Sequence, residues 1–186
     1  VLGEFVGSQD QVAASYGGFN HICFLQDGSF DVTPSVLNLE AKNILNDHLM
    51  LVFTGIRRHA SEIEKTKIKN ISTNRVNLDR IANLVLAAEK ELLVNTFDIS
   101  NFGEMLHETW EHKKALAREV STAPIDELYE VARGSGAIGG KLLGAGGGGF
   151  LLLLAPPNRH ASIKKAFKNL CFIDFKFEEE GATVIR

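Results

Sequence analysis

A run of glycines in the carboxyl-terminal part constrains this chain more than any other sequence feature. Residues 144–149 read Gly-Ala-Gly-Gly-Gly-Gly. Glycine loses more backbone entropy on folding than any other residue, so such a run needs a compensating role. Residue types alone leave two interpretations open. One is a plain loop with tight turns, and the other is a loop whose backbone amides converge on an anion such as phosphate.

Two stretches match the dinucleotide-binding pattern G-x-G-x-x-G, at 134–139 and at 144–149. This pattern works where it leaves a strand and opens a helix, because the pyrophosphate then lies at the helix amino terminus. Here the first match follows a predicted helix and the second leads into an apolar strand. Lys141 is followed by Leu142, where a phosphate-binding P-loop has Ser or Thr. Both common nucleotide motifs are therefore excluded.

The apolar periodicity predicts strands and helices without regular alternation, which indicates the α+β class. Asp27-Gly28 lies between two strand-like runs and predicts a hairpin turn. The predicted strands are 19–25, 29–36, 48–53, 150–155, 172–177 and 183–185. The predicted helices are 9–16, the region 60–120 with 100–119 as a separate helix, one that starts near Pro124, and 159–170.

Amino-acid composition and net charge indicate which kind of molecule this chain binds. Of 186 residues, 45% are hydrophobic and 23% charged, which is ordinary for a globular domain. A formal net charge of -3 offers no basic surface for nucleic acid or an acidic membrane, so we expect a small-molecule partner. The longest apolar stretch, 150–157, is far shorter than the roughly 20 residues of a membrane span.

The two cysteines and the first residues lead to two further predictions, on the redox state of the thiols and on the extent of the chain. Cys23 and Cys171 are flanked by apolar residues, which predicts reduced thiols in a core and a cytoplasmic setting. The chain opens on Val1 without an initiator methionine, in a stretch that reads as an element already under way. We therefore expect a fragment of a longer protein.

Several motifs together resemble one enzyme family. Residues 139–150, Gly-Gly-Lys-Leu-Leu-Gly-Ala-Gly-Gly-Gly-Gly-Phe, resemble the third motif of the GHMP kinases, the superfamily of galacto-, homoserine, mevalonate and phosphomevalonate kinases. Residues 7–11, Gly-Ser-Gln-Asp-Gln, resemble the segment that carries a catalytic aspartate in its sugar kinases. The members that act on D-glycero-D-manno-heptose 7-phosphate are most similar, through further stretches at 13–20, 53–58, 107–110 and 177–178.

The resemblance implies a fold and a domain division. We expect a ferredoxin-like GHMP kinase C-terminal domain at 37–186. Residues 1–36 are expected to be the remnant of an incomplete amino-terminal kinase domain, with the helix of the catalytic aspartate and a hairpin. The family's glycine- and serine-rich phosphate loop has no counterpart in this sequence. We therefore expect an incomplete ATP pocket, with the Mg²⁺ ligands largely elsewhere, and a chain that is inactive alone.

The same resemblance implies an activity and a set of site residues. The reaction is transfer of the ATP γ-phosphate, with Mg²⁺, to the anomeric hydroxyl of the heptose phosphate, and Asp10 is the expected catalytic base. The residues expected to contact sugar phosphate or transferring phosphate are Gly144, Ala145, Gly146, Gly147, Gly148, Thr54 and Arg57, with Arg58 beside the last.

Each of these assignments has an alternative. Taken alone, Asp10 is typical of a helix cap or a dipole-complementing charge, Thr54 of a turn, and Arg57 of solvated surface. His107 and His112 are five residues apart, whereas a zinc pair on a helix needs four, so we assign no metal ligands. Another sugar kinase such as a fucokinase, or a non-catalytic domain that keeps the fold, remains an alternative, and a homodimer is also considered.

Overall fold

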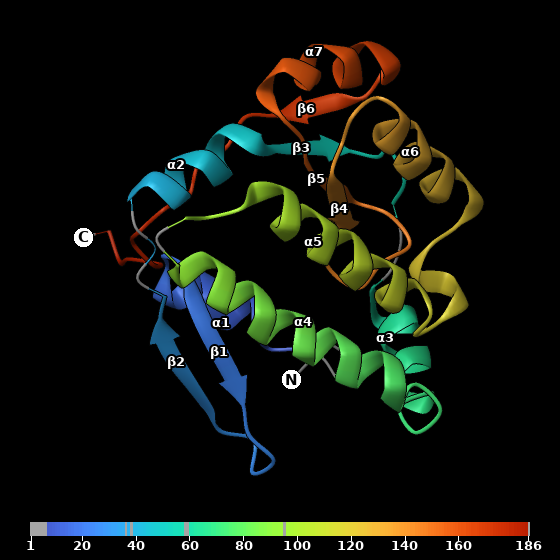
Figure 1. The fold of residues 1–186 in the computed structure, drawn as a ribbon. Coiled ribbons are helices and arrows are strands. Elements are labelled where there is room, and N and C mark those ends of the chain that lie inside the picture. The colour runs from blue at the N-terminus through green and yellow to red at the C-terminus, as the bar shows by residue number, and fades with distance from the viewer. Residues whose placement is uncertain (1–6, 36, 38, 58–59, 95, 186) are drawn as a thin grey trace.

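The computed structural model describes residues 7–35, 37, 39–57, 60–94 and 96–185 (Figure 1). Its helices are α1 (Gln9–Tyr16), α2 (Leu39–His48), α3 (Ala60–Lys69), α4 (Arg75–Leu93), α5 (Ile99–Lys114), α6 (Ala123–Gly134) and α7 (Pro157–Ala166), with a 3-10 turn, η1, at Arg118–Val120. Its strands are β1 (Asn20–Phe24), β2 (Phe30–Pro34), β3 (Leu49–Phe53), β4 (Gly139–Leu142), β5 (Phe150–Leu154) and β6 (Cys171–Ile173).

A four-stranded antiparallel sheet forms the centre of the molecule, in the order β4-β5-β3-β6. Along the chain, helices separate β3 from β4, β4 and β5 follow each other directly, and α7 leads to β6. This is the β-α-β-β-α-β arrangement of ferredoxin-like folds, elaborated by additional helices after β3. The predicted α+β class and the ferredoxin-like fold are therefore confirmed.

The two faces of the sheet are packed differently. Antiparallel pairing places Leu142 opposite Leu151, and both are fully buried against Trp110 and Tyr129 in the larger core. Lys141 lies opposite Leu152, and both are only partly buried. Because successive side chains in a strand point to opposite faces, Lys141 projects from the face that is less completely covered.

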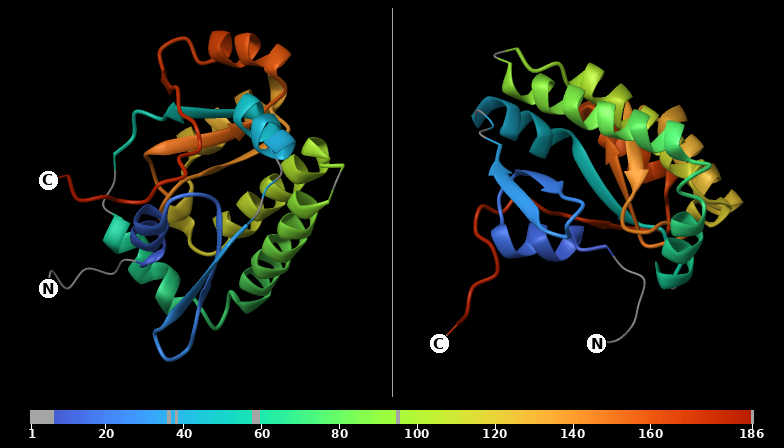
Figure 2. Two further views of the ribbon diagram at one scale, coloured as in Figure 1. Left: turned by 90° about the vertical axis from the view of Figure 1, so that its left-hand side faces the viewer. Right: turned by 90° about the horizontal axis from the view of Figure 1, so that it is seen from below.

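The amino-terminal elements are joined to the sheet by the carboxyl-terminal segment. The Gly18 amide donates to Glu178 O at 2.8 Å, and the Ala182 amide donates to Ala14 O at 2.9 Å. The Phe177 amide donates to Asn46 Oδ1 at 3.2 Å, which ties the same segment to α2. Figure 2 shows this segment running from β6 past α1. The division at residue 36 stays a prediction, although these bonds cross it.

The predicted hairpin is confirmed, with Asn20 to Phe24 paired antiparallel to Phe30 to Pro34. Asp27 Oδ1 accepts from the Ser29 amide at 2.9 Å and stabilises the turn. Residue 36, the last of the predicted second strand, lies outside the described residues. The predicted helices at 9–16 and 100–119 correspond to α1 and α5, although α5 ends at Lys114.

Several other predictions are wrong. The strand expected at 172–177 spans only Cys171–Ile173, and residues 183–185 form no strand. Both cysteines are free but exposed rather than in a core, because they sit in β1 and in the edge strand β6. Strand β4 and helix α2 were not expected. In the part of the chain that the structure describes, no helix is long and apolar enough to cross a membrane.

Alanine at Gly139 is expected to destabilise the fold strongly, because β4 approaches α5 most closely there. A Cβ atom at Gly139 would lie 2.0 Å from Gly103 O and 2.9 Å from Gly103 C. The contacting atoms belong to the backbone of α5, so the added methyl group can fit only if β4 or α5 moves. Gly139→Ala should therefore lower the free energy of unfolding by about 3 kcal/mol or more. Chemical denaturation measures this.

The matched control is Gly134→Ala at the end of α6, where an added Cβ would meet nothing within 4 Å. Alanine is the better helix former by about 1 kcal/mol, so this variant should be neutral or slightly more stable. Equal stability of the two variants would contradict the described contact between β4 and α5.

Candidate functional site

The glycine loop, residues 143–149, connects the edge strand β4 to its inner neighbour β5. Gly144, Gly146, Gly147 and Gly149 have φ values of 65°, 113°, 74° and 94°, a region that side chains rarely adopt. The Leu143 amide donates to Phe150 O at 2.9 Å and closes the base of the loop. The glycines are therefore required by the backbone path of this loop.

Two neighbouring segments hold the glycine loop in place. The Gly147 amide donates to Val120 O at 2.8 Å, and the Gly149 amide donates to Ile56 O at 2.9 Å. An added Cβ at Gly148 would lie 2.5 Å from Ile56 O, so the loop and the residues after β3 are in direct contact. The loop is thus a fixed structure, clamped between η1 and the end of β3.

Thr54 belongs to this clamp. It is buried, with a relative exposure of 5%, and both its amide and its hydroxyl donate to Gly149 O, at 2.9 Å and 2.8 Å. The hydroxyl also accepts weakly from the Ile56 amide at 3.3 Å. Its hydrogen bonds thus connect the end of β3 to the loop. These bonds agree with the alternative role of Thr54 as a turn residue and involve no substrate contact.

Part of the loop keeps its donors available. Among the described residues, no acceptor bonds to the amides of Gly144, Ala145, Gly146 and Gly148. The Gly147 amide, which we expected to contact phosphate, is already bonded to Val120 O. Four of the five predicted loop residues can therefore donate to an anion, and Gly147 can do so only by giving up its internal bond.

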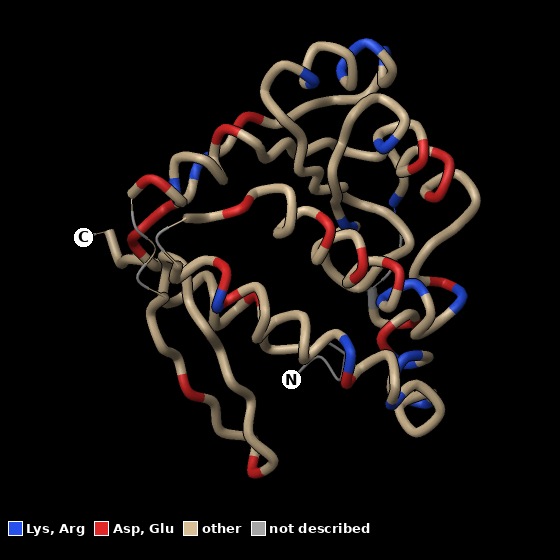
Figure 3. The backbone as a smooth tube through the Cα atoms, in the orientation of Figure 1, with Lys and Arg blue, Asp and Glu red and all other residues tan. Residues whose placement is uncertain are grey.

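Lys113 in the last turn of α5 contacts the start of the glycine loop. Its Nζ donates to Leu142 O at 2.9 Å and to Gly144 O at 2.7 Å. Burial and the nearby Lys141 ammonium lower the pKa of Lys113 from 10.5 to about 7. Figure 3 shows basic residues of α3 and of the end of α5 on the same side of the molecule.

Lys141 on β4 and Asp10 on α1 complete the cluster. Burial lowers the pKa of Lys141, and the Asp10 carboxylate acts in the opposite direction on the pKa of both Lys141 and Lys113. Asp10 is exposed in the first turn of α1, whose N-cap residue is Ser8. Residues more than 100 positions apart in the sequence thus lie within electrostatic range of one another, and Lys113 among them contacts the glycine loop.

Sequence reasoning missed both lysines as site residues. Lys141 was excluded as a P-loop lysine and lies in the motif at 139–150 without a role of its own, and Lys113 was assigned no role in the site. Pairing of Gly139–Leu142 as a strand places Lys141 on the incompletely covered face, and this alternation was the available signal. For Lys113 the sequence holds no such signal, because its acceptors are backbone oxygens of another element.

Within the described part of the chain, the other predicted residues form no hydrogen bond or ion pair with Lys113, Lys141 or Asp10. Arg57 follows β3 and is exposed, and Arg58 lies outside the described residues. His107 Nδ1 is 2.8 Å from the Tyr129 hydroxyl, whereas His112 Nδ1 is 2.8 Å from Asn77 Oδ1. The two histidines thus have separate partners. Within the described ranges, no three His, Cys, Asp or Glu side chains gather in a way that holds a metal ion.

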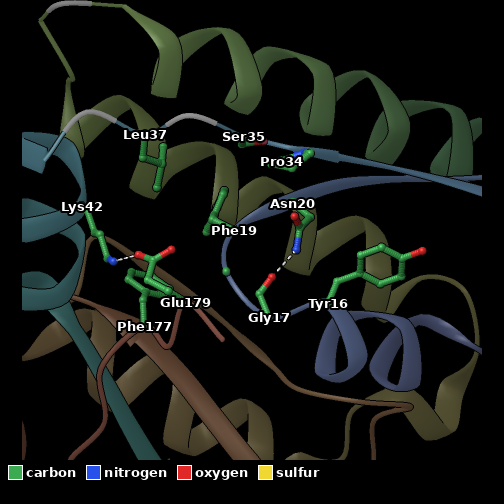
Figure 4. Close-up of a pocket in the computed structure, with 11 residues that line it drawn as sticks. Tyr16, Gly17, Phe19, Asn20, Pro34, Ser35, Leu37, Lys42, Phe177 and Glu179 are labelled. Carbon is green, nitrogen blue, oxygen red and sulfur yellow. Dashed lines mark hydrogen bonds and ion pairs between the residues drawn. The ribbon is translucent and has the colours of Figure 1, made fainter. Parts of the chain in front are cut away.

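A cavity lies at the other end of α1, lined in part by Gly17, Phe19 and Phe177 (Figure 4). Its volume is about 370 Å³, and the Lys42–Glu179 ion pair borders it. Neither Asp10 nor the glycine loop lines this cavity. It is separate from the cluster around Lys113.

The stability of the protein should depend on pH through Lys113. Between its folded pKa of about 7 and its unfolded value of 10.5, the unfolded state binds more protons, so stability rises with pH. The contribution is at most about 1.4 kcal/mol per pH unit. Lys113→Met should remove this contribution, and denaturation curves of both proteins at pH 7, 8 and 9 measure it. Parallel pH profiles would contradict the burial of this ammonium.

Comparisons with known proteins agree on one family. Residues 88–172 match the family described as GHMP kinases C terminal. A curated relative, D-glycero-alpha-D-manno-heptose 7-phosphate kinase of Campylobacter jejuni, is 32% identical over 184 residues, which cover 97% of this chain and 54% of that protein. The chain therefore spans about half the length of the curated relative that it matches.

Solved structures show the same relationship. The crystal structure of a D-glycero-D-manno-heptose 1-phosphate kinase from Bacteroides thetaiotaomicron has a TM-score of 0.68 and 26% identity, over 97% of this chain and 50% of that one. Leishmania major mevalonate kinase, solved with R-mevalonate, has a TM-score of 0.69 at 21% identity, over 94% of this chain and 53% of that chain. The second likeness concerns the fold alone.

Proposed function

Because the chain contains the GHMP kinase C-terminal domain, we propose that it is the carboxyl-terminal part of an ATP-dependent sugar kinase. The proposed acceptor is D-glycero-D-manno-heptose 7-phosphate, phosphorylated at its anomeric hydroxyl. The 32% identity to a heptose 7-phosphate kinase supports this substrate class. We also propose that the chain requires the remainder of such a kinase for activity, since it spans 54% of that relative.

One spatial relation carries the proposed chemistry. Asp10 interacts electrostatically with Lys113 and Lys141, and Lys113 is bonded to the start of the glycine loop. Phosphoryl transfer depends mainly on positioning and on stabilisation of negative charge. In the proposed reaction Asp10 aligns the sugar hydroxyl and accepts its proton. The unbonded amides at 144–146 and 148 stabilise the transferring phosphoryl group.

Magnesium enters this function only with the nucleotide. The cluster offers Asp10 as its carboxylate, and the described residues bring no set of metal ligands together beside it. They therefore do not fit a resident Mg²⁺ site. Its proposed ligands are ATP oxygens and groups supplied by the rest of the kinase.

A coupled ADP-release assay on the complete gene product tests the proposal. The acceptors are D-glycero-D-manno-heptose 7-phosphate, fucose, galactose and mevalonate. We expect ADP release with the heptose phosphate and little with the others. Preference for fucose would overturn the proposed substrate and keep the sugar kinase. No ADP release with any acceptor, together with no ATP binding by calorimetry, would favour a non-catalytic domain.

A further inference from the structure

We infer that Lys113 and Lys141 together form a binding site for a phosphate group beside the glycine loop. The inference rests on the proposed function for the source of that group, which is either the nucleotide or the phosphorylated sugar. It assigns two named side chains to an anionic ligand, Lys141 within the motif at 139–150 and Lys113 on α5 outside it.

The first argument concerns hydrogen-bond donors. A lysine ammonium has three N–H donors, and Lys113 uses two of them, on Leu142 O and Gly144 O. Lys141 bonds to no acceptor among the described residues, so all three of its donors remain. The unbonded amides of the glycine loop lie next to the Lys113 contact at Gly144. Lys113 on α5, Lys141 on β4 and the loop amides therefore have hydrogen-bond donors that no acceptor among the described residues occupies.

The second argument concerns charge. The groups that act on Lys113 are Lys141 on β4, Lys67 and Glu64 on α3, and Asp10 on α1. Glu64 is committed to Lys67, with Oε1 and Nζ 2.6 Å apart. Asp10 is then the one carboxylate of this group left for two ammonium ions. A phosphate dianion supplies the negative charge that the cluster lacks.

The third argument concerns the cost of the arrangement in the absence of a ligand. Loss of hydration on burial lowers the pKa of both lysines, and the Lys141 ammonium lowers the pKa of Lys113 further. Packing alone does not favour two buried ammonium groups, since apolar side chains of similar size would avoid this loss of hydration. Strongly perturbed pKa values of this kind are typical of binding and catalytic sites.

Sulfate is a suitable first probe, because it remains a dianion between pH 6 and 9 while phosphate itself titrates. We expect the wild-type protein to bind sulfate with amide chemical-shift changes at 144–146 and 148. Binding should weaken as pH rises through about 7, where Lys113 loses its proton. The same titration of Lys113→Met should show weaker binding that lacks the decrease near pH 7.

Lys141→Met separates binding from folding. It removes the charge and keeps much of the aliphatic stem, so we expect unchanged or raised thermal stability together with at least about tenfold weaker sulfate binding. Lys165→Gln is the matched control, because Lys165 is an exposed lysine on α7. It should bind sulfate as the wild type does. Sulfate binding that is absent in wild type, or unchanged in Lys141→Met, would overturn the inference.

Steady-state kinetics of the complete gene product identify the source of the phosphate. A raised KM for ATP in Lys141→Met assigns the site to the nucleotide, and a raised KM for the heptose phosphate assigns it to the sugar. Wild-type KM and kcat in an active Lys141→Met enzyme would overturn the inference and leave the kinase function intact. Lysine-dependent sulfate binding in a protein that phosphorylates no sugar would overturn the kinase function alone.

Discussion

Asp10→Asn is expected to lower kcat of the complete gene product by about 10²- to 10⁴-fold, the usual contribution of a positioned general base. Asparagine keeps the size of the side chain and a hydrogen-bonding oxygen but cannot accept the proton of the sugar hydroxyl. Folding should be unaffected, because Asp10 is exposed and Ser8, not Asp10, is the N-cap of α1.

The dipole alternative makes a different prediction for the same variant. A charge in the first helical turn contributes about 0.3–1 kcal/mol to stability, and its loss leaves turnover unchanged. Thermal unfolding and kcat measured on one preparation therefore separate the two roles. Wild-type turnover with a slightly lower melting temperature would assign Asp10 to the helix dipole and remove it from the site.

Gly148→Ala is expected to lower turnover by about 100-fold or more. The added Cβ would lie 2.5 Å from Ile56 O, the atom that accepts from the Gly149 amide. Since Ile56 O is backbone, either the loop or the segment after β3 must move. A displacement of about 1 Å at a phosphoryl-transfer site is enough for a loss of this size.

Gly148 tests the loop better than Gly147 does. Gly147 has a φ of 74° and its amide is bonded to Val120 O, so valine at this position would disturb folding as well as chemistry. Gly134→Ala again serves as the control, since its added Cβ meets nothing within 4 Å. Normal kcat and KM in a folded Gly148→Ala enzyme would show that the loop does not position the reacting groups.

The elements that sequence predicts well are those with strong local signals. Asp27-Gly28 specifies a hairpin turn, and the helix predicted at 9–16 spans Gln9–Tyr16. Strand β4 was missed because Gly139 and Gly140 have low strand propensity. Gly139 is accepted there because α5 passes so close that no side chain fits, and an added Cβ at Gly140 would lie 2.5 Å from Leu152 O of β5. Tertiary packing, not local preference, decides this strand.

Only the part of the site that carries local sequence motifs was predicted. Asp10 and the glycine loop carry motifs that can be recognised along the chain. Lys113 and Lys141 acquire their roles only when the end of α5, β4 and α1 are brought together. Their lowered pKa values are a consequence of burial, which no spacing in the sequence expresses. The role of Thr54 likewise depends on a contact 95 residues away, at Gly149 O.

Transfer of phosphate that depends on Asp10 is the most direct test of the kinase assignment. The complete gene product is incubated with ATP, Mg²⁺ and D-glycero-D-manno-heptose 7-phosphate, and the products are followed by ³¹P NMR. We expect a second sugar phosphate resonance at the anomeric position to grow with ADP in the wild type, and to be nearly absent in Asp10→Asn. Loss of ATP signal without a new sugar phosphate, or equal rates in both proteins, would contradict it.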